Sequence, residues 1–150
     1  MPYKTPISVL VVIHTPDLQV LLLERADNPD WWQSVTGSLE AGETPLQTAI
    51  REVAEETGLD SAQYQLKDWH YHHQYEIYPR FRYRYAPEVM HNTEHVFSLS
   101  VPAPLPVTLS EREHLRYIWL PAALAAKKCF SPSNQAAIIR LLGAQSDDTN

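Results

Sequence analysis

Residues 37–59 read GSLEAGETPLQTAIREVAEETGL, and this stretch carries the strongest helix signals of the chain. Thr44 can cap a helix, Pro45 suits its first position, and Gln47 can complete a capping box. The predicted helix runs up to Gly58, which stands where a left-handed C-terminal cap belongs. We therefore expect one helix of about thirteen residues, bounded by these signals.

The two sides of this helix differ in their chemistry. At about 100° per residue, the apolar side chains fall on one side. The residues of that side are Leu46, Ala49, Ile50, Val53 and Thr57. Glu52, Glu55 and Glu56 fall on the other flank. The sequence thus predicts that the helix packs on the fold by its apolar side and presents its carboxylates outward.

Clustered glutamates repel one another, so their placement needs a compensating charge. A solvated helix face usually intersperses lysines that pair at i,i+4, and this segment contains none. Glu52 and Glu56 are four residues apart and share one face, with Glu55 beside them. A hard divalent cation such as Mg²⁺ binds carboxylates together with phosphate oxygens of a substrate. The cluster therefore predicts a magnesium site.

Three neighbouring residues are expected to shape this site. Arg51 is the natural partner of a glutamate in the preceding loop, and we assign it to Glu43. Gly37 is expected to end a strand where the backbone bends sharply, and Gly58 to supply the positive φ of the helix end.

The segment as a whole resembles the Nudix box, Gly-x5-Glu-x7-Arg-Glu-U-x-Glu-Glu-x-Gly-U, in which U is a bulky aliphatic residue. The matching residues are Gly37, Glu43, Arg51, Glu52, Val53, Glu55, Glu56, Gly58 and Leu59. The resemblance implies an α/β/α sandwich on which the box forms a loop-helix-loop. It also implies hydrolysis of a nucleoside diphosphate that is linked to another group.

The resemblance implies roles for individual side chains. Glu52 and Glu56 are the first metal ligands, for Mg²⁺ or for Mn²⁺ as a substitute. Glu55 is an additional ligand or the base that activates water, and the choice between Glu55 and Glu56 as the base stays open. Arg51 belongs to the catalytic set as the residue that orients a glutamate.

Outside the box, the chain resembles one branch of this family, the bacterial dihydroneopterin triphosphate pyrophosphatases. The stretches that carry this resemblance are YKTPISVLVVI, WWQSVTGSLEAGE, RYAPEVMHNTE, EHLRYIWL and SNQAAI. In that branch a glutamate of the EHL segment is a metal ligand, which favours Glu113 over Glu111. The implied reaction converts 7,8-dihydroneopterin triphosphate to the monophosphate and pyrophosphate in folate biosynthesis, with side activity on nucleoside triphosphates.

The same branch supplies the expected substrate contacts. Lysine and arginine side chains suit a triphosphate, and the segment YEIY matches a pocket segment whose two aromatic rings can sandwich a flat heterocycle. Ser131 matches across an apparent one-residue insertion. The expected substrate-binding residues are Lys4, Arg25, Thr36, Tyr75, Glu76, Ile77, Tyr78 and Ser131.

The rest of the chain reads mainly as strands. ISVLVVIH and QVLLLER are predicted to form a hairpin around TPDL, and WWQSVTG a third extended segment. Further strands are predicted at YQLKDWHYHHQYEIYP, PRFRYRYAP, EHVFSLSVP and RYIWL. In PRFRYRYAP the arginines would line one strand face and the aromatic side chains the other.

Helical segments are also expected near the C-terminus. Residues 121–126 are predicted to form a helical turn, and Ser133 or Asn134 to cap a final helix that ends at Gly143. The sum is one domain over residues 1–150, of the α/β (α+β) class with a mixed sheet and two flanking helices. Residues 143–150 are expected to form a flexible tail.

Composition argues against several classes of protein. A net charge of −6 and a pI near 5.6 argue against a general nucleic-acid binder, although phosphorylated ligands can bind through a divalent cation. The single cysteine, Cys129, excludes an internal disulfide and favours a reducing, cytoplasmic compartment. Nowhere do about 18 apolar residues run together, so we expect no membrane span.

Two other functions stay open beside the pterin reaction. One is a general hydrolase of nucleoside triphosphates or dinucleoside polyphosphates. The other is a non-catalytic Nudix module that senses a nucleotide, which the intact carboxylate set opposes. In each case the expected partner is a small molecule, and the sequence leaves the choice between monomer and homodimer undetermined.

Overall fold

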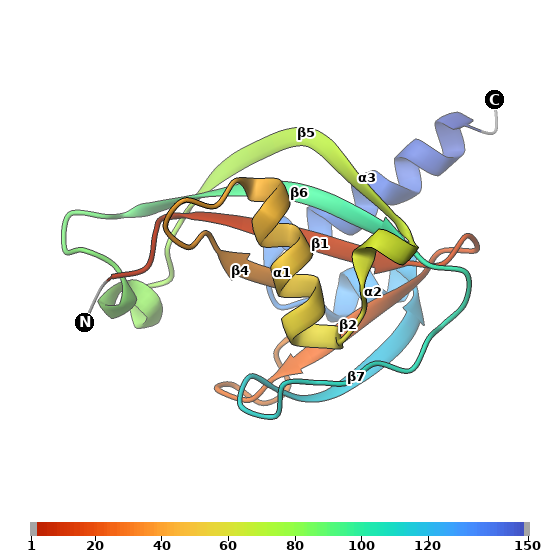
Figure 1. Ribbon diagram of the computed structural model, residues 1–150, viewed down its shortest axis with the longest axis horizontal. Coiled ribbons are helices and arrows are strands. Elements are labelled where there is room, and N and C mark those ends of the chain that lie inside the picture. The colour runs from red at the N-terminus through yellow and green to blue at the C-terminus, as the bar shows by residue number, and fades with distance from the viewer. Residues whose placement is uncertain (1–2, 149–150) are drawn as a thin grey trace.

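The apolar runs of the sequence join into one mixed sheet, which helices cover on both faces (Figure 1). The computed structural model describes residues 3–148, and within that range the sheet has seven strands. The strands are β1 (Ile7–His14), β2 (Gln19–Arg25), β3 (Trp32–Gln33), β4 (Val35–Ser38), β5 (Gln65–Glu76), β6 (His91–Ser100) and β7 (His114–Pro121). Five of them lie in the order β3-β2-β1-β6-β5, while β4 pairs with β1 and β7 with β2.

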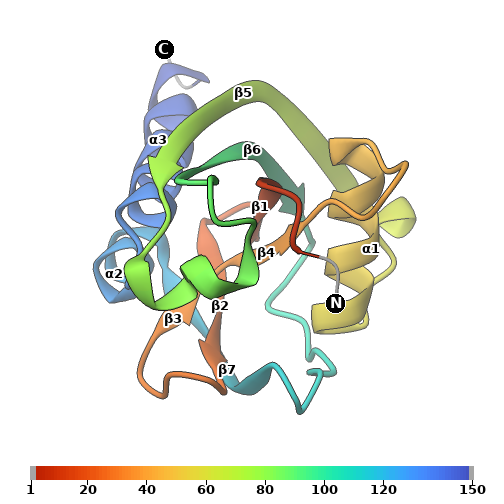
Figure 2. The ribbon, with the colours of Figure 1, turned by 90° about the vertical axis from the view of Figure 1, so that its left-hand side faces the viewer.

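The helices divide between the two faces of the sheet. They are α1 (Pro45–Thr57), α2 (Ala122–Lys128) and α3 (Pro132–Asp148), with short 3₁₀ turns at η1 (Ser61–Gln63) and η2 (Pro79–Arg84). Figure 2 shows α1 on one side of the sheet and both α2 and α3 on the other. β1 and β6 are parallel, whereas β5 and β6 are antiparallel. The expected α/β/α sandwich with a mixed sheet is therefore confirmed.

Strands β1 and β2 pair at one end only, and this divergence shapes the molecule. They meet antiparallel at His14 and Val20, as the predicted hairpin requires. Farther along, β1 pairs with β4 while β2 pairs with β3. The WWQSVTG stretch, which we expected to be one extended segment, thus forms two short strands that fill the space between the diverging partners.

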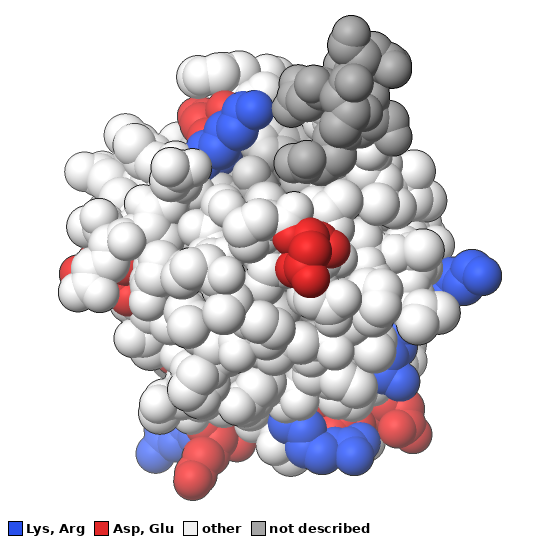
Figure 3. Space-filling model, turned by 90° about the vertical axis from the view of Figure 1, so that its right-hand side faces the viewer, with Lys and Arg blue, Asp and Glu red and all other residues white. Residues whose placement is uncertain are grey.

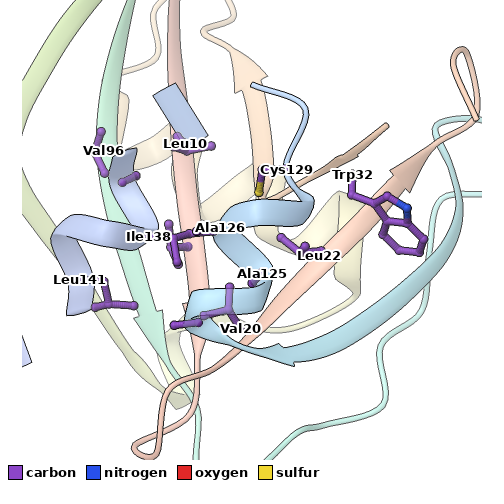
Figure 4. Close-up of a cluster of buried hydrophobic side chains, with 13 residues drawn as sticks. Leu10, Val20, Leu22, Trp32, Val96, Ala125, Ala126, Cys129, Ile138 and Leu141 are labelled. Carbon is purple, nitrogen blue, oxygen red and sulfur yellow. The ribbon is translucent and has the colours of Figure 1, made fainter. Parts of the chain in front are cut away.

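The side chains of β1 alternate between two cores on opposite faces of the sheet. Val9, Val11 and Ile13 belong to the core beneath α1. Leu10 and Val12 belong to the core beneath α2 and α3, where Ala and Ile side chains of these helices pack on the strands (Figure 4). Because both faces are covered, the strand is an unbroken apolar run rather than an alternating one.

The helix signals of the Nudix-like segment are confirmed in detail. The Gln47 backbone N–H donates to Thr44 Oγ1 (3.2 Å), and the Thr44 N–H donates to Gln47 Oε1 (2.9 Å), so the capping box is closed. At the other end Gly58 has a φ of 75° and donates its N–H to Ala54 O (2.9 Å). Local sequence therefore fixes both ends of α1.

The buried side of α1 differs from the predicted one. Leu46 and Ile50 are 46% and 44% exposed, whereas Glu52 and Glu56 are only 8% and 2% exposed. The buried residues of the helix are Thr48, Ala49, Glu52, Val53, Glu56 and Thr57. The prediction that the carboxylates face outward is wrong for these two glutamates and right for Glu55, whose side chain is 51% exposed. Hydrophobic periodicity does not predict this orientation of α1, because it contains no information about the space that Gly37 of β4 leaves beside the helix.

PRFRYRYAP is a 3₁₀ turn and not the predicted strand. Pro79 opens η2, where its fixed φ and missing N–H suit a helical first turn. The arginines do not separate from the aromatic rings as predicted. The guanidinium carbons of Arg80 and Arg84 lie 5.4 Å and 5.0 Å from the centroid of the Phe81 ring.

The last helix begins earlier than predicted. The N–H of Asn134 donates to Ser131 Oγ (3.4 Å), so Ser131 caps the helix in place of Ser133 or Asn134. The Asn134 side chain is engaged elsewhere, because its Oδ1 accepts from the backbone N–H of Ser34 (2.7 Å). This buried pair ties α3 to the segment between β3 and β4.

The last helix also ends later than predicted. It continues through Gly143 to Asp148, so the expected tail from residue 143 onward is wrong up to that point. Gly143 does not adopt a positive φ and therefore does not terminate the helix. Residues 149–150 of the expected tail lie outside the described residues. No helix in residues 3–148 combines the length and apolar character that crossing a membrane requires.

Gly58→Ala and Gly143→Ala should change stability in opposite directions. At Gly58 the φ of 75° is costly for any L-residue, by about 1–2 kcal/mol. At Gly143 a methyl group meets open space, and alanine is favoured over glycine in a helix by up to about 1 kcal/mol. Urea denaturation should show a loss for the first variant and a gain for the second. Changes of the same sign would contradict the assigned ends of α1 and α3.

Candidate active site

A pocket of about 580 Å³ is lined by residues of both η2 and the N-terminal segment. These two segments lie at the end of the molecule that faces the viewer in Figure 2. Lys4 is anchored there, since its backbone N–H donates to Arg84 O (2.8 Å). At the opposite end, outside the residues drawn in grey, the charged side chains are scattered and of both signs (Figure 3). The expected site residues that line the pocket are Lys4, Arg25, Thr36, Glu56, Tyr75, Glu76, Ile77, Tyr78, Glu113 and Ser131. The others, Arg51, Glu52 and Glu55, form one hydrogen-bonded group beside it.

The Arg51 guanidinium is the centre of that group. It binds Glu43 through two bonds, from Nε (2.7 Å) and from Nη2 (2.9 Å), so the predicted contact is present. Nη1 also donates to Glu52 (2.7 Å) and Glu55 (3.2 Å), and Nη2 donates to Ser38 O (3.1 Å). The hydrogen bonds from Arg51 lower the pKa of Glu43 to about 2. The loop before α1 and two glutamates of α1, Glu52 and Glu55, are thus held by one cation.

Gly37 has a different function from the predicted one. It lies within β4, paired with Val9, and does not have the positive φ of a sharp bend. A Cβ atom at this position would lie 2.2 Å from Cδ of Glu52. The glycine therefore provides the space in which the Glu52 side chain is buried, and burial raises the pKa of Glu52.

Glu56 is the most unusual group of the site. It is 2% exposed, and within the described residues neither of its carboxylate oxygens has a hydrogen-bond partner. The nearest basic atom recorded is Nε2 of His114, at 3.5 Å from Glu56 Oε1. Burial and the neighbouring Glu52 raise the pKa of Glu56 well above its ordinary value. Burial, reinforced by Arg25, lowers the pKa of His114 to about 4, so this imidazole is neutral and offers Glu56 little compensation.

These features fit a hard divalent cation. A buried carboxylate with two unpartnered oxygens is costly unless a positive charge reaches it. No cluster of three or more His, Cys, Asp or Glu side chains at metal-binding distance occurs in residues 3–148. The expected ligands Glu52, Glu56 and Glu113 are therefore not gathered at coordinating distance in this structure. Mg²⁺ commonly takes one or two carboxylates together with water and phosphate oxygens.

Part of the pocket lining is cationic. Arg25 forms a bidentate pair with Asp27, through Nε (2.7 Å) and Nη2 (2.6 Å), and Arg84 reaches the same carboxylate at 3.3 Å. The hydrogen bond from Arg25 is the main reason that the pKa of Asp27 falls to about 2. Burial, together with Arg84 and Arg25, lowers the pKa of Lys4. Sequence reasoning missed Asp27, because only the fold shows that it orients two arginines.

Aromatic rings lie beside the cationic part of the lining. Trp31 and Phe130 stack with centroids 4.4 Å apart, and Tyr78 lies within 6.2 Å of both rings. Phe81 joins them, with the Arg25 guanidinium carbon 5.0 Å from its centroid. Tyr75 lies apart from this group, in β5. Both tyrosines line the pocket, as expected, whereas no sequence signal pointed to Trp31, Phe81 and Phe130, which come from distant segments.

The remaining expected residues are held mainly through backbone contacts. Thr36 donates its hydroxyl to Val9 O (2.9 Å), and Ile77 is buried with its N–H donating to Met90 O (2.9 Å). In the loop before β7, the Glu113 carbonyl accepts from the Ala26 N–H (2.9 Å), which fixes this loop against β2. Glu113 lines the pocket and Glu111, two residues earlier, is absent from the lining within residues 3–148.

Comparison with known proteins gives a consistent result. A model of the NUDIX domain matches residues 4–142. Dihydroneopterin triphosphate diphosphatase of Escherichia coli K12 is 48% identical over 139 residues, which cover 91% of each chain. The protein of the same name from Haemophilus influenzae is 46% identical over 145 residues, covering 95% of this chain and 90% of that one. The solved structure of the E. coli dihydroneopterin triphosphate pyrophosphohydrolase has a TM-score of 0.87 at 46% identity, covering 93% of this chain and 97% of that one.

Glu56 predicts an unusual dependence of stability on pH in the presence of a chelator. Its folded pKa lies above the ordinary value of 4.5, so between these two values the folded chain retains a proton that the unfolded chain has lost. This contribution to the free energy of unfolding is present at low pH and is lost as the pH rises through the folded pKa. His114 acts in the opposite direction between about 4 and 6.5, so a variant is needed to isolate Glu56.

Glu56→Gln should therefore gain stability relative to the unsubstituted protein as the pH rises from 5 to 8 with chelator present. Glu55→Gln, an exposed neighbour, should show no such trend. Thermal unfolding of the three proteins measures this, and Mg²⁺ should stabilise the unsubstituted protein more than Glu56→Gln. A difference between the proteins that is constant with pH would contradict the raised pKa of Glu56.

Proposed function

The chain belongs to the NUDIX family, and we propose that it is a Mg²⁺-dependent pyrophosphohydrolase of 7,8-dihydroneopterin triphosphate. The products would be dihydroneopterin monophosphate and pyrophosphate, as in folate biosynthesis. The observation that carries the chemistry is the buried, unpartnered carboxylate of Glu56, which lines a pocket together with cationic and aromatic side chains. The relatives named above, which match nine-tenths or more of this chain at 46–48% identity, support the substrate.

Three glutamates are the proposed ligands of the cation. Glu52 and Glu56 project from one face of α1, and Glu113 approaches from the loop before β7. A bound Mg²⁺, or Mn²⁺ in its place, would offset the charge of the leaving pyrophosphate and make an attacking water more acidic. Arg51 acts as a positioning residue, since it fixes Glu52 and Glu43 relative to each other.

Glu55 and Glu56 are the two candidates for the group that takes the proton of the attacking water. Glu56 lines the pocket. Glu55 is half exposed and is not among the residues of 3–148 that line it. Its carboxylate instead accepts a hydrogen bond from Arg51 (3.2 Å). These positions favour Glu56 as the base.

The cationic part of the lining is proposed to bind the triphosphate. Asp27 holds Arg25 through two hydrogen bonds, and Nη1 of Arg25 donates to Gln33 Oε1 (3.0 Å), so the guanidinium is fixed at the pocket lining. A planar guanidinium that is already oriented binds phosphate oxygens in a bidentate manner at a reduced entropy cost. Lys4 adds a second cation, and Ser131 and Thr36 supply hydroxyl groups at the lining. This arrangement does not depend on the ring of the substrate, so we also propose side activity on nucleoside triphosphates.

Two broader statements belong to the same proposal. We propose that residues 1–150 act as one catalytic domain, with a cytoplasmic location. Cys129 suits a reducing compartment without a catalytic role, because burial raises the pKa of its thiol to about 12.

The substrate is tested by kcat/KM for dihydroneopterin triphosphate, GTP and dATP, with Mg²⁺ and with chelator. We expect a pterin preference of about tenfold or more, equivalent to about 1.4 kcal/mol of transition-state discrimination, and loss of activity with chelator. Equal or reversed values would contradict the pterin assignment. Absence of Mg²⁺-dependent hydrolysis of every substrate would instead favour a nucleotide-sensing module.

The third ligand is tested by a matched pair of neighbouring substitutions. Glu113→Gln should lower kcat/KM by at least about 100-fold, since even groups that only support metal ligands are worth about 10–100-fold. Glu111→Gln removes a charge from the same exposed loop outside the pocket lining and should leave kcat/KM within about twofold. Equal losses in both variants, or none in either, would contradict the assignment of Glu113.

A further inference from the structure

Two buried polar side chains of β6 line the pocket and have no role in the hydrolysis described above. Asn92 and Glu94 are 0% and 3% exposed, and both belong to the pocket lining. They are two residues apart on one strand, so their side chains share the same face of the sheet. Buried polar groups in a pocket are costly unless a ligand or another group satisfies them.

The side chain of Asn92 is fixed by its amide nitrogen, and its amide oxygen is an unpaired acceptor in the described residues. Its Nδ2 donates to Ser8 Oγ (2.7 Å) and to Tyr75 Oη (3.1 Å). Within residues 3–148, its buried Oδ1 has no hydrogen-bond partner. Burial raises the pKa of Tyr75, so the phenol keeps its proton and can donate it. This part of the pocket therefore combines an unpaired acceptor with a hydroxyl donor.

Glu94 adds a carboxylate to the same part of the pocket. Its Oε1 is 2.9 Å from Nε2 of His73. Within residues 3–148, His73 does not line the pocket, so it fixes the Glu94 side chain from outside the pocket. A carboxylate repels a triphosphate, which belongs with the cations of Lys4 and Arg25. Glu94 therefore suits the uncharged end of a substrate, and it suits groups that donate hydrogen bonds.

The ring of a pterin has such groups. Its 2-amino-4-oxo edge presents a ring N–H and an NH₂ group side by side, and a carboxylate can accept from both at once. Guanine has the same edge. Hypoxanthine keeps the ring N–H and lacks the NH₂ group. Adenine presents an unprotonated ring nitrogen there, whose lone pair would face the carboxylate and be disfavoured.

We propose that Glu94, with Asn92 beside it, selects substrates by the adjacent N–H and NH₂ donors of a 2-amino-4-oxo ring. This inference rests on the proposed function, because it assumes that a triphosphate with a heterocyclic end occupies this pocket. It assigns specificity to β6, whereas the cations of Lys4 and Arg25 serve every triphosphate. Removing the carboxylate should therefore change which ring is accepted more than whether phosphate is released.

Glu94→Gln tests this with four substrates: dihydroneopterin triphosphate, GTP, ITP and ATP. The substitution keeps the volume of the side chain and can still bind His73. We expect kcat/KM to fall by about tenfold or more for dihydroneopterin triphosphate and GTP, less for ITP, and not at all for ATP. An equal loss for all four substrates would overturn the proposal, because it would indicate a structural effect.

His73→Gln is the matched control. It removes the group that holds Glu94 from behind and leaves the carboxylate in the pocket, so the preference for GTP over ATP should be retained. If His73→Gln and Glu94→Gln change that preference equally, the pair is structural and the proposal fails. If Glu94→Gln does not fold, the unsubstituted protein decides: kcat/KM for GTP should exceed that for ITP by about tenfold, and equality would overturn the proposal.

The same panel separates this inference from the proposed function. If the unsubstituted protein hydrolyses GTP with the same kcat/KM as the pterin substrate, the pterin assignment fails. A selective loss in Glu94→Gln would then still support the role of Glu94. Were the preference for dihydroneopterin triphosphate and GTP over ATP retained in Glu94→Gln, the proposed function would stand and the role of Glu94 would be overturned.

Discussion

The burial of the Glu56 carboxylate is the constraint on which the rest of the site depends. An ionised group at 2% exposure with no hydrogen-bond partner in the described part of the chain is unfavourable by itself. The fold keeps it there because α1 is capped at both ends and packs through Ala49 and Val53 on the sheet. The stability of the core thus holds a carboxylate in a position that a divalent cation would relieve. The same carboxylate would then favour binding of the cation and take part in catalysis.

The sheet provides the space around this group. Because β1 and β2 diverge after His14 and Val20, the short strands β3 and β4 are inserted between them, and the pocket opens beside these strands. Gly37 in β4 leaves room for Glu52, and Arg51 connects Glu52 to the loop that holds Glu43. The cations of Lys4 and Arg25 and the acceptors of Asn92 and Glu94 line the same pocket, and β6, which carries the acceptors, lies next to β1.

The sequence predicted those features whose signals are local. The caps of α1, the pairing of Arg51 with Glu43 and most strands follow from neighbouring residues. The predictions that failed concern features set by tertiary contacts. Periodicity favours Leu46 and Ile50 as core residues of α1, and it therefore does not predict the orientation of the helix that buries Glu56. Asn92 and Glu94 look like ordinary strand residues until β5 and β1 are placed beside them. η2 was missed because alternation of arginines and aromatics outweighed the signal of Pro79.

The most direct test of this account is the position of Mn²⁺ in a crystal of the protein, located by anomalous scattering. The account predicts a peak in contact with the Glu56 carboxylate, with Glu52 and Glu113 as its other protein neighbours. Mn²⁺ bound only on the exposed side of α1, at Glu55 or Glu40, with Glu56 unliganded, would contradict the claim that the buried carboxylate exists to hold the cation.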